Sequence, residues 1–565
     1  MVDAPRSEST HRQALLVVLF AAVVVALAAL RATLGLSFYD DSYYVVIPLR
    51  FAHGARLFVD ELSVQSLGEL VSVPFVKVYE ALFGLTGIVL FVRELYVAMA
   101  ALVGIVLYRL LRRGGAGPAA ALVAVTVPLL TVPYHLIAPT YNTVAQMCFT
   151  LSIVLGWSAM RDGRARLAGV SGVLIAVGAA AYPPFAIAAL VLLLTFALMA
   201  RKRALILAAL GGAVLAAALI AAAILIGLSA DDLRRTVAFA SANVGSIASP
   251  LDKLGAALVH LGGALFSPWL WPMWACALLA SIPPLPRQLR AVALIAIPVT
   301  AAAPGISLLA QGNGFSFGSA VSSWLITLTL GIAVPSIVWA LSAGRRDFLR
   351  LVALATPFGL TGYLTVAWVT NSSWNRGTGS IALAPLALGL LLCWSTAIGE
   401  LWEEGVEWTA VVLIVLVAFG LLFANIFSDP LSLTSHTLVT NGPYAGLTMS
   451  DPHASQLGEL GAAGRRWVGP DTRVTFLGER ETYLAVGGIW DTPAVWLSPA
   501  PSDRATIEYY DRRGKPAQVV FVDGLSITPE GGYAAKNRDP YLAYVLGNYH
   551  QVGSAALFDI FVRNK

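Results

Sequence analysis

The stretch "QALLVVLFAAVVVALAALRATL" (Gln13–Leu34) decides the fold class of this 565-residue chain. A transmembrane helix needs about 20 mostly apolar residues, and this stretch has that length and composition. It is longer than the apolar core of a signal peptide and lacks a convincing cleavage site, so we expect a retained first helix. The next segment, "LSFYDDSYYVVIPLRFAHGARLFVDEL" (Leu36–Leu62), places paired carboxylates where the chain leaves the bilayer.

The composition supports an integral membrane protein. The chain is 58% hydrophobic and 12% charged, and its mean hydropathy is +0.75, whereas soluble proteins carry about 25% charged residues. The net charge of +5 lies mostly in short loops, so it reports orientation and gives no reason to expect nucleic-acid binding. Cys148, Cys276 and Cys393 all lie in apolar segments without metal-ligand spacing, so we expect buried thiols and no disulfides.

Windows of about 20 apolar residues predict a polytopic helical protein with thirteen transmembrane helices. Two neighbouring spans are separated by Pro183-Pro184, which predicts a tight turn between two short helices. The predicted spans are 13–35, 90–111, 117–135, 142–160, 166–182, 184–200, 203–228, 255–282, 289–310, 320–342, 349–370, 379–399 and 408–427.

The basic residues predict the direction of these spans. Cytoplasmic loops are enriched in Lys and Arg, and five basic loops each fall between an even span and the next odd one, on the same side as the N-terminus. We therefore place the N-terminus in the cytoplasm and the segment after the first span outside it. The acidic loop "GELWEEGVEW" is an exception, but acidic residues count little in this rule. The basic loops are "YRLLRRGG", "MRDGRARL", "ARKRA", "PLPRQLR" and "AGRRDFLR".

Residues 43–58 and 62–84 mix apolar, aromatic and a few charged residues, so we expect amphipathic helices lying at the membrane interface in the first external loop. Val71, Phe75, Val78 and Leu82 are spaced to share one helical face.

The composition becomes polar after the last span, which divides the chain into a transmembrane domain (1–427) and a small extracytoplasmic α/β domain (428–565). Alternation of short strands and helices supports the α/β prediction. The predicted strands are 473–478, 494–498, 518–524 and 555–564, and the predicted helices are 453–467, 504–514 and 539–550.

Asp40 and Asp41 are the leading candidates for catalytic groups. They could simply be solvated or cap a helix, but the tyrosines that follow and the amphipathic segment beyond place them in a groove. A carboxylate held there can take a proton from an acceptor hydroxyl as a general base. Asp60, in the nearby acidic pair Asp60-Glu61, is a second acidic candidate.

Further polar residues could bind a ligand at the outer face. Ionisable residues within a span are costly in free energy, so we expect Arg93 and Glu94 to face a site. Alternatively, the Arg93 side chain could extend to the membrane interface. The polar side chains of the turn 132–143 could line a sugar pocket, or they could only form hydrogen bonds with the backbone of the turn itself. The loop 370–380 offers an arginine and many donors to a phosphate, and Arg234 either binds a phosphate or lies on a solvated face. The candidate donor-binding residues are Arg93, Glu94, Tyr43, His135, Tyr141, Asn142, Arg234 and Arg376.

Several function classes lack their motifs. We find no P-loop, no GxGxxG after a strand, no HExxH and no GxSxG in a supporting context. An ATP-driven pump and a soluble-type serine hydrolase are therefore disfavoured.

The succession "FYDDSYYVV", "HGARLFVDEL", "PFVKVYEALFG" and "VRELYVAMAALVGIVLYRLLRR" resembles the polyprenyl-phosphate-sugar-dependent membrane glycosyltransferases of the GT-C class. That class includes bacterial relatives of protein mannosyltransferases, lipid A aminoarabinose transferases and actinobacterial arabinosyl- and mannosyltransferases. The resemblance covers roughly residues 13–200 in pattern, at the level of a superfamily.

The resemblance implies an inverting transfer from a polyprenyl-phosphate-linked sugar to a cell-envelope glycan or lipid, in cell wall biogenesis. Asp40 would be the base and Asp41 the second acid, while Arg93, Arg376 or Arg234 would stabilise the departing phosphate. No cofactor is certain, and a divalent metal is possible because some relatives use one. The chain is rich in Ala, Val, Leu, Gly and Arg, as proteins of high-GC bacteria are, so we expect it in the plasma membrane of such a bacterium.

Two other functions compete with this one. A transporter or lipid-linked-sugar flippase would also have many spans, but transporters usually show internal repeats with broken helices at matching positions, and we find no such pairing. A scaffold whose C-terminal domain binds a cell-wall polymer would not need acidic and basic residues at the membrane surface.

Overall fold

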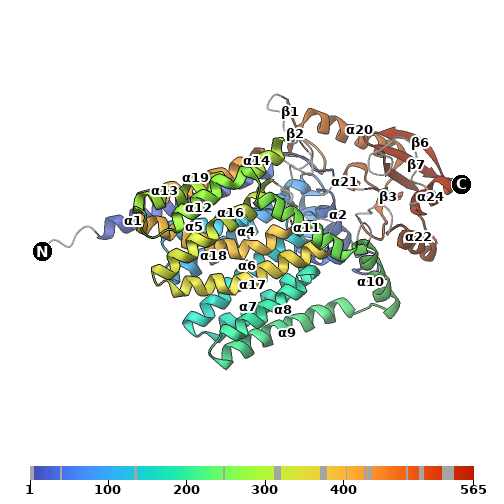
Figure 1. Cartoon of the computed structure of the whole chain (residues 1–565). Coiled ribbons are helices and arrows are strands. Elements are labelled where there is room, and N and C mark those ends of the chain that lie inside the picture. Colours follow the sequence, from blue (N-terminus) through green and yellow to red (C-terminus); the bar gives the residue numbers. More distant parts are fainter. Residues whose placement is uncertain are drawn as a thin grey trace.

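The chain is mostly helical and carries a small α/β region after its last long helix (Figure 1). The computed structural model describes residues 6–38, 41–132, 137–245, 249–310, 320–369, 378–402, 404–424, 429, 435–478, 481–495, 502–524 and 540–564.

Within those residues, nine helical segments are long and apolar enough to cross a membrane, which makes the chain a multi-pass membrane protein. A tenth is reached if α11 (Pro250–Leu265) and α12 (Trp271–Ser281), which are bent by 55° around η4 (Pro268–Leu270), form one span. The nine are α1 (Arg6–Ala32), α4 (Ile88–Arg113), α6 (Tyr141–Asp162), α9 (Arg203–Leu225), α13 (Arg287–Thr300) with α14 (Ala303–Ala310), α16 (Ala320–Ser342), α17 (Arg346–Val369), α18 (Thr378–Leu401) and α19 (Glu404–Ala424).

Three of the thirteen predicted spans are shorter helices. They are α5 (Pro118–Leu130), α7 (Ala165–Ala181) and α8 (Ala186–Met199), of 13, 17 and 14 residues. Helix α5 ends two residues after Pro128, and η3 (Pro183–Phe185) separates α7 from α8 at the predicted Pro-Pro turn. Almost all of α5 is buried, so packing against other helices stabilises it and a full bilayer length is not required.

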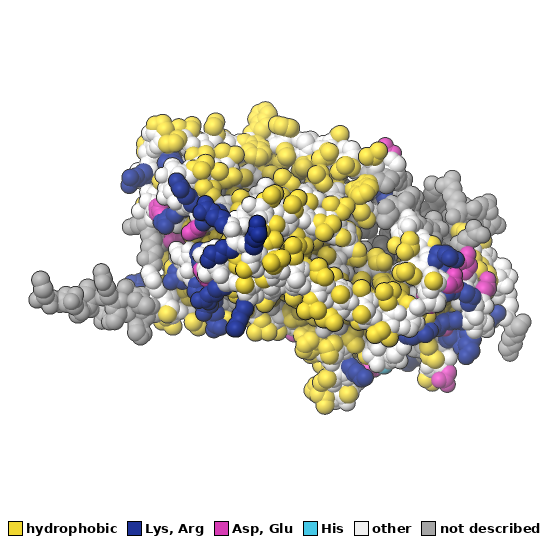
Figure 2. Space-filling model, turned by 90° about the horizontal axis from the view of Figure 1, so that it is seen from below, with side chains coloured by type: hydrophobic (Ala, Val, Ile, Leu, Met, Phe, Trp, Pro, Cys, Tyr) yellow, Lys and Arg dark blue, Asp and Glu magenta, His cyan; other side chains and the backbone are white. Residues whose placement is uncertain are grey.

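The distribution of side chains fits a membrane setting. In Figure 2, hydrophobic side chains cover the middle of the helical part, and Lys and Arg side chains gather at the end that carries the N-terminus and again on the C-terminal region. The apolar window of α18 is 94% buried, whereas that of α1 is 0% buried. Helix α18 therefore lies at the centre of the bundle and α1 at its periphery.

The segment between α1 and α4 contains α2 (Tyr43–Ala52), η1 (Val64–Ser72) and α3 (Val73–Phe83). Helix α3 exposes Phe75, Val78 and Leu82 together, as expected for an interfacial helix, whereas Val71, predicted on the same face, belongs to η1. The prediction was wrong for α2, whose residues from Tyr43 to Arg50 are all buried. It lies inside the protein because the C-terminal region packs over it in one hydrophobic cluster.

The C-terminal region is built on a five-stranded sheet of order β4-β3-β5-β7-β6. Strand β3 is parallel to β4 and β5, while β7 is antiparallel to β5 and β6. A two-stranded sheet of β1 and β2 lies nearer α1, since Gly35 N–H donates to the Thr448 carbonyl over 2.7 Å. The elements are β1 (His436–Leu438), β2 (Thr448–Ser450), α20 (Asp451–Trp467), β3 (Arg473–Leu477), α21 (Tyr483–Val486), β4 (Ile489–Trp490), α22 (Ser502–Arg513), β5 (Val519–Asp523), α24 (Pro540–Asn548), β6 (Tyr549–Ala555) and β7 (Phe558–Arg563).

Most predicted elements of this region are confirmed. Strands β3, β5 and β7 and helices α20 and α22 lie where the sequence predicts them. The helix predicted over 539–550 ends at Asn548, because Tyr549 begins β6, which pairs with β7. The predicted strand 494–498 is not a strand at 494–495, and its remaining residues lie outside the described part.

Helices α7 and α9 pack closely through glycines. A Cβ on Gly172 would lie 1.9 Å from the Ala209 carbonyl oxygen, and one on Gly212 would lie 2.2 Å from the Gly169 carbonyl oxygen. Small residues let helix backbones approach one another in membranes. The α7–α9 pair therefore depends on these glycines.

We expect Gly212→Ala to lower the melting temperature of the purified protein, because the new methyl group must push α9 away from α7. Gly211→Ala is the matched control, since a Cβ there has no atom within 4 Å and alanine favours the helix by about 1 kcal/mol. Equal melting temperatures for the two variants would contradict this account of the α7–α9 contact.

Candidate functional site

Asp41 is buried beside Arg93 just beyond the end of α1. Arg93 Nη2 donates to Asp41 Oδ2 over 2.7 Å, and Ser37 N–H donates to the same oxygen over 2.5 Å. Both side chains are about 7% exposed. Asp40, the predicted base, lies outside the described residues.

The remaining donors of Arg93 bind the backbone at the end of α1. Its Nη1 donates to the carbonyls of Ala32 and Leu34 over 2.9 and 3.3 Å, and Nη2 donates to Gly35 over 3.0 Å. The last carbonyls of a helix lack intrahelical partners. A cation at that end is also attracted by the negative end of the helix dipole. Arg93 therefore joins α4 to the end of α1 and to Asp41. Among the described residues its contacts are those of a structural arginine, and none of them marks it as a phosphate ligand. Glu94, its neighbour, is half-buried.

The predicted sugar-binding turn is partly described. His135 lies outside the described residues, while Tyr141 and Asn142 begin α6 after a capping box at Thr140. The Asn142 side chain is buried, and its Oδ1 has no hydrogen-bond partner in the described structure. Tyr141 N–H donates to Glu69 Oε1 over 3.3 Å. The start of α6 is therefore in contact with η1.

Glu69 was missed by the sequence reasoning. It is fully buried, and burial raises the pKa of its carboxyl well above the usual value. Tyr43, on α2, is also buried, and its hydroxyl makes no hydrogen bond of standard geometry to a described residue. The one available signal was the repeat of polar residues at every third position, Ser66, Glu69 and Ser72, within an otherwise apolar stretch.

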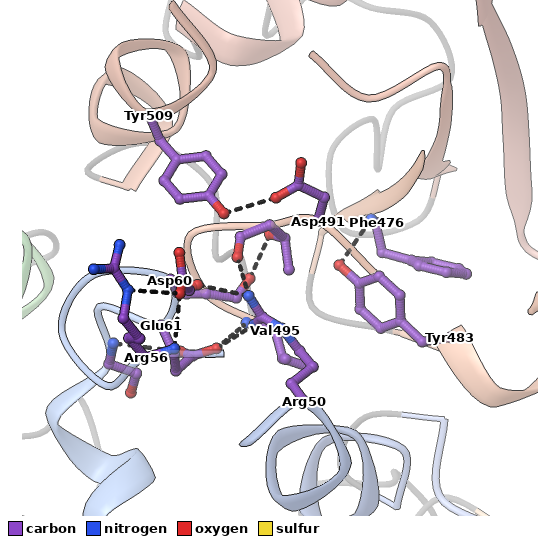
Figure 3. Close-up of polar contacts among 12 residues, drawn as sticks. Arg50, Arg56, Asp60, Glu61, Phe476, Tyr483, Asp491, Val495 and Tyr509 are labelled. Atoms are coloured by element: carbon purple, nitrogen blue, oxygen red, sulfur yellow. Dashed lines mark hydrogen bonds and ion pairs between the residues drawn. The ribbon is translucent and has the colours of Figure 1, made fainter. Parts of the chain in front are cut away.

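A buried ion pair, also missed, joins the α1–α4 segment to the C-terminal region (Figure 3). Arg50 Nη1 donates to Glu61 Oε2 over 2.6 Å, and Arg50 Nη2 donates to the Thr492 carbonyl over 2.6 Å. Val495 N–H donates to the same Glu61 oxygen over 3.2 Å. Burial raises the pKa of Glu61 to about 7, against the opposing effect of Arg50.

Asp60 belongs to the same junction. Its Oδ2 accepts from Arg56 N–H over 2.7 Å, and its Oδ1 pairs with Arg513 of α22. Arg513 also donates to Asp491 over 2.8 Å, and Tyr509 donates its hydroxyl to the same carboxylate over 2.7 Å. These partners give Asp60 a connecting role between the two regions. Figure 3 shows Asp60 beside Arg56, and Tyr509 beside Asp491.

The two other predicted arginines do not join this junction in the described structure. Arg376 lies outside the described residues. The Arg234 side chain is 81% exposed on α10 (Ala230–Gly245) and lies 3.8 Å from Asp231. Among the residues described, no group of three His, Cys, Asp or Glu side chains is placed to hold a metal ion.

An apolar groove of about 360 Å³ lies directly beneath η1. It is partly open, and α4, α6, α7 and α9 form its walls. A groove without charged or polar lining side chains suits an alkyl or isoprenoid chain. Its lining residues are Leu67, Gly68, Leu70, Val71, Met99, Val103, Val144, Met147, Cys148, Leu151, Leu174, Val177, Ala180, Ala181 and Ile220.

We expect Arg50→Ala to lower the free energy of unfolding by about 3–5 kcal/mol, because it leaves the Glu61 carboxylate buried without its counter-charge. Arg56→Ala is the control, since Arg56 is 65% exposed and lies 3.6 Å from Asp60, and such pairs contribute at most about 1 kcal/mol. Thermal unfolding in detergent at pH 8 measures both, and similar losses for the two variants would refute the assignment.

Glu61 should also make stability depend on pH. Because its pKa is raised from 4.5 to about 7, the folded state binds the proton more tightly than the unfolded state. This contribution is fully present below about pH 4.5 and is lost as the pH rises through 7. We expect the melting temperature of the wild type to fall between pH 5 and 8 more steeply than that of Glu61→Gln. Parallel curves would show that Glu61 does not titrate in this range.

The site thus joins an apolar groove to buried polar side chains on the same short helix, η1. No family model matches the chain, and no significant match is found among the curated proteins. The function of the site is therefore inferred from the chemistry of its own residues.

Proposed function

We propose that the chain is an inverting membrane glycosyltransferase that moves a sugar from a polyprenyl phosphate to a cell-envelope glycan or lipid at the outer face of a bacterial plasma membrane. The observation that carries the proposal is the apolar groove beneath η1. A substrate with a long apolar tail and a polar head would place its tail there and its head beside the α1–α4 segment. The resemblance of that segment to GT-C enzymes supports the same conclusion.

The proposal includes an orientation. We infer that α5, α7 and α8 are embedded beside the long helices, which gives thirteen helices in the membrane, with the N-terminus in the cytoplasm and the C-terminal region outside. The gathering of Lys and Arg side chains near the N-terminal end supports this direction (Figure 2).

The reaction needs a base and a group that stabilises the leaving phosphate. In the proposed step Asp40 takes the proton of an acceptor hydroxyl, and the hydroxyl oxygen attacks C1 of the sugar. The bond between C1 and the phosphate oxygen breaks, and the lipid phosphate leaves with its electron pair. Arg376 or Arg234 would stabilise that charge. Asp41 forms an ion pair with Arg93 over 2.7 Å. It would act as a positioning residue that holds the neighbouring Asp40 in place.

The test of the base is turnover by the purified protein in lipid nanodiscs, with a panel of polyprenyl-phosphate sugars and a crude envelope acceptor. We expect Asp40→Asn to reduce transfer by about 10²–10⁴-fold, the usual contribution of general base catalysis, without weakening donor binding. Asp471→Asn, an exposed site in the C-terminal region, is the control. Transfer that survives in Asp40→Asn would rule out this base, and transport of donor across the bilayer without transfer would favour a flippase.

The groove is tested separately. Val177→Trp should fill it and raise the KM for the donor about tenfold or more, with the KM for the acceptor unchanged. Val170→Trp is the matched control, because Val170 lies on the same helix but is 49% exposed and does not line the groove. Equal donor KM values in the two variants would mean that the groove does not hold the lipid tail.

A further inference from the structure

Helix η1 has two chemically different sides. A 3₁₀-helix has three residues per turn, so side chains three positions apart eclipse one another. Ser66, Glu69 and Ser72 are spaced in this way and have 0% exposure. Leu67, Gly68, Leu70 and Val71 of the same element line the apolar groove. The polar side is therefore turned into the protein, away from the lipid-facing groove.

The polar side carries oxygens that the described protein does not satisfy. Glu69 Oε2, Ser72 Oγ and Asn142 Oδ1 lack hydrogen-bond partners among the described residues. The Ser66 and Tyr43 hydroxyls make no hydrogen bond of standard geometry there, although Ser66 interacts with the Glu61 carboxyl and Tyr43 with the Ser63 side chain. An unsatisfied buried polar group costs about 1–3 kcal/mol, and native proteins keep few of them. These five groups, on α2, η1 and the start of α6, indicate that something else completes their hydrogen bonds.

These elements approach one another closely. Glu69 Oε1 accepts from Tyr141 N–H over 3.3 Å, which brings the carboxyl beside Asn142. A Cβ on Gly68 would lie 2.2 Å from Cα of Tyr141, so the backbones of η1 and α6 are in direct contact. After burial, the charges of Glu61 and Glu69 are the next largest causes of the raised pKa of Tyr43. Tyr43, on α2, therefore lies within electrostatic range of both carboxyl groups.

The chemistry of the five groups selects a neutral, hydroxyl-rich ligand. Three hydroxyls can each donate and accept, and the Asn142 amide oxygen accepts. Burial raises the pKa of Glu69 well above its usual value and so favours the neutral carboxyl, which can donate as well as accept. None of the five supplies a positive charge, whereas phosphate is usually bound by Arg or Lys. A phosphate is therefore a poor fit and a sugar is a good one.

We propose that Ser66, Glu69 and Ser72, together with Tyr43 and Asn142, form the subsite that binds the hydroxyl groups of the transferred sugar. The inference rests on the proposed function and deepens it, because it separates the lipid tail and the sugar onto the two sides of one short helix. The tail lies against the apolar side of η1, and the sugar lies against its polar side.

The test compares two probes on the protein in nanodiscs: bare undecaprenyl phosphate, and the undecaprenyl-phosphate sugar that the wild type turns over. We expect the double variant Ser66→Ala/Ser72→Ala to weaken binding of the sugar-loaded lipid about tenfold or more, with binding of the bare lipid unchanged. The melting temperature of the ligand-free protein should not fall in Ser72→Ala alone, because Ser72 Oγ has no hydrogen-bond partner among the described residues, whereas Ser66 also interacts with the Glu61 carboxyl. A merely structural role for Ser72 would instead lower it.

Two further variants complete the test. Glu69→Gln, which can still donate and accept, should retain sugar binding, whereas Glu69→Leu should lose it. Ser158→Ala is the matched control, because Ser158 is buried and lacks a partner in the described structure but lies near the other end of α6.

Equal weakening of both probes, or of neither, in the double serine variant would overturn the subsite and leave the proposed function intact. A ligand-free melting temperature that drops in Ser72→Ala, with the preference for the sugar-loaded lipid retained, would also overturn it. If the wild type binds and turns over no member of the sugar-lipid panel, the proposed function fails and the subsite fails with it.

Discussion

The end of α1 is the constraint on which the rest of the structure depends. A helix that leaves a membrane has unpaired carbonyls in its last turn, and each costs free energy if it is buried without a donor. Arg93 of α4 donates to the carbonyl of Ala32, the last residue of α1, and to the carbonyls of Leu34 and Gly35 just beyond it, and Asp41 balances its charge. Because the arginine is buried, the aspartate cannot move away without leaving an uncompensated charge.

This arrangement constrains the path of the chain beyond α1. With Asp41 held at the end of α1, α2 begins inside the protein at Tyr43 and ends near Arg50. Arg50 meets Glu61 and the Thr492 carbonyl, so the α1–α4 segment is joined to the C-terminal region by a second buried charge pair. The carboxyl end of β3 approaches from the other side, where Glu481 N–H donates to the Phe38 carbonyl over 2.8 Å. The C-terminal region is thus part of the enclosure around α2.

The sequence predicts the features that depend on local pattern. Apolar runs and basic loops reveal the long helices, and alternation reveals β3, β5 and β7, because both signals are carried by neighbouring residues. It overestimates the length of the span at α5, since an apolar run does not say where a helix ends when proline is near. The bounds of α7 and α8 and the turn between them are predicted closely. Strand β6 is missed because its pairing with β7 overrides the helical pattern that precedes it.

The site shows the same division. Asp41 and Arg93 are recognisable as unusual from sequence, but their pairing to each other and to backbone carbonyls depends on contacts between separate elements. Arg50 and Glu61 bond across the fold to residues more than 400 positions away, which no local pattern can reveal. The Ser66, Glu69 and Ser72 repeat is visible, yet it reads as an ordinary solvated edge unless the helix type and burial are known.

Under the proposed function, helix η1 gives a reason why an amphiphilic substrate would fit this fold better than a purely polar or purely apolar one. Its period of three residues aligns Ser66, Glu69 and Ser72 on one side and leaves the groove-lining residues on the others. An α-helix of the same sequence would turn about 100° per residue and would spread those three side chains around its surface. The 3₁₀ geometry therefore creates a sharp boundary between an apolar groove and a buried polar surface, at the level where a lipid tail would meet its polar head. A buried oxygen without a partner costs stability, so the oxygens on that boundary favour the proposed ligand over a purely anchoring role.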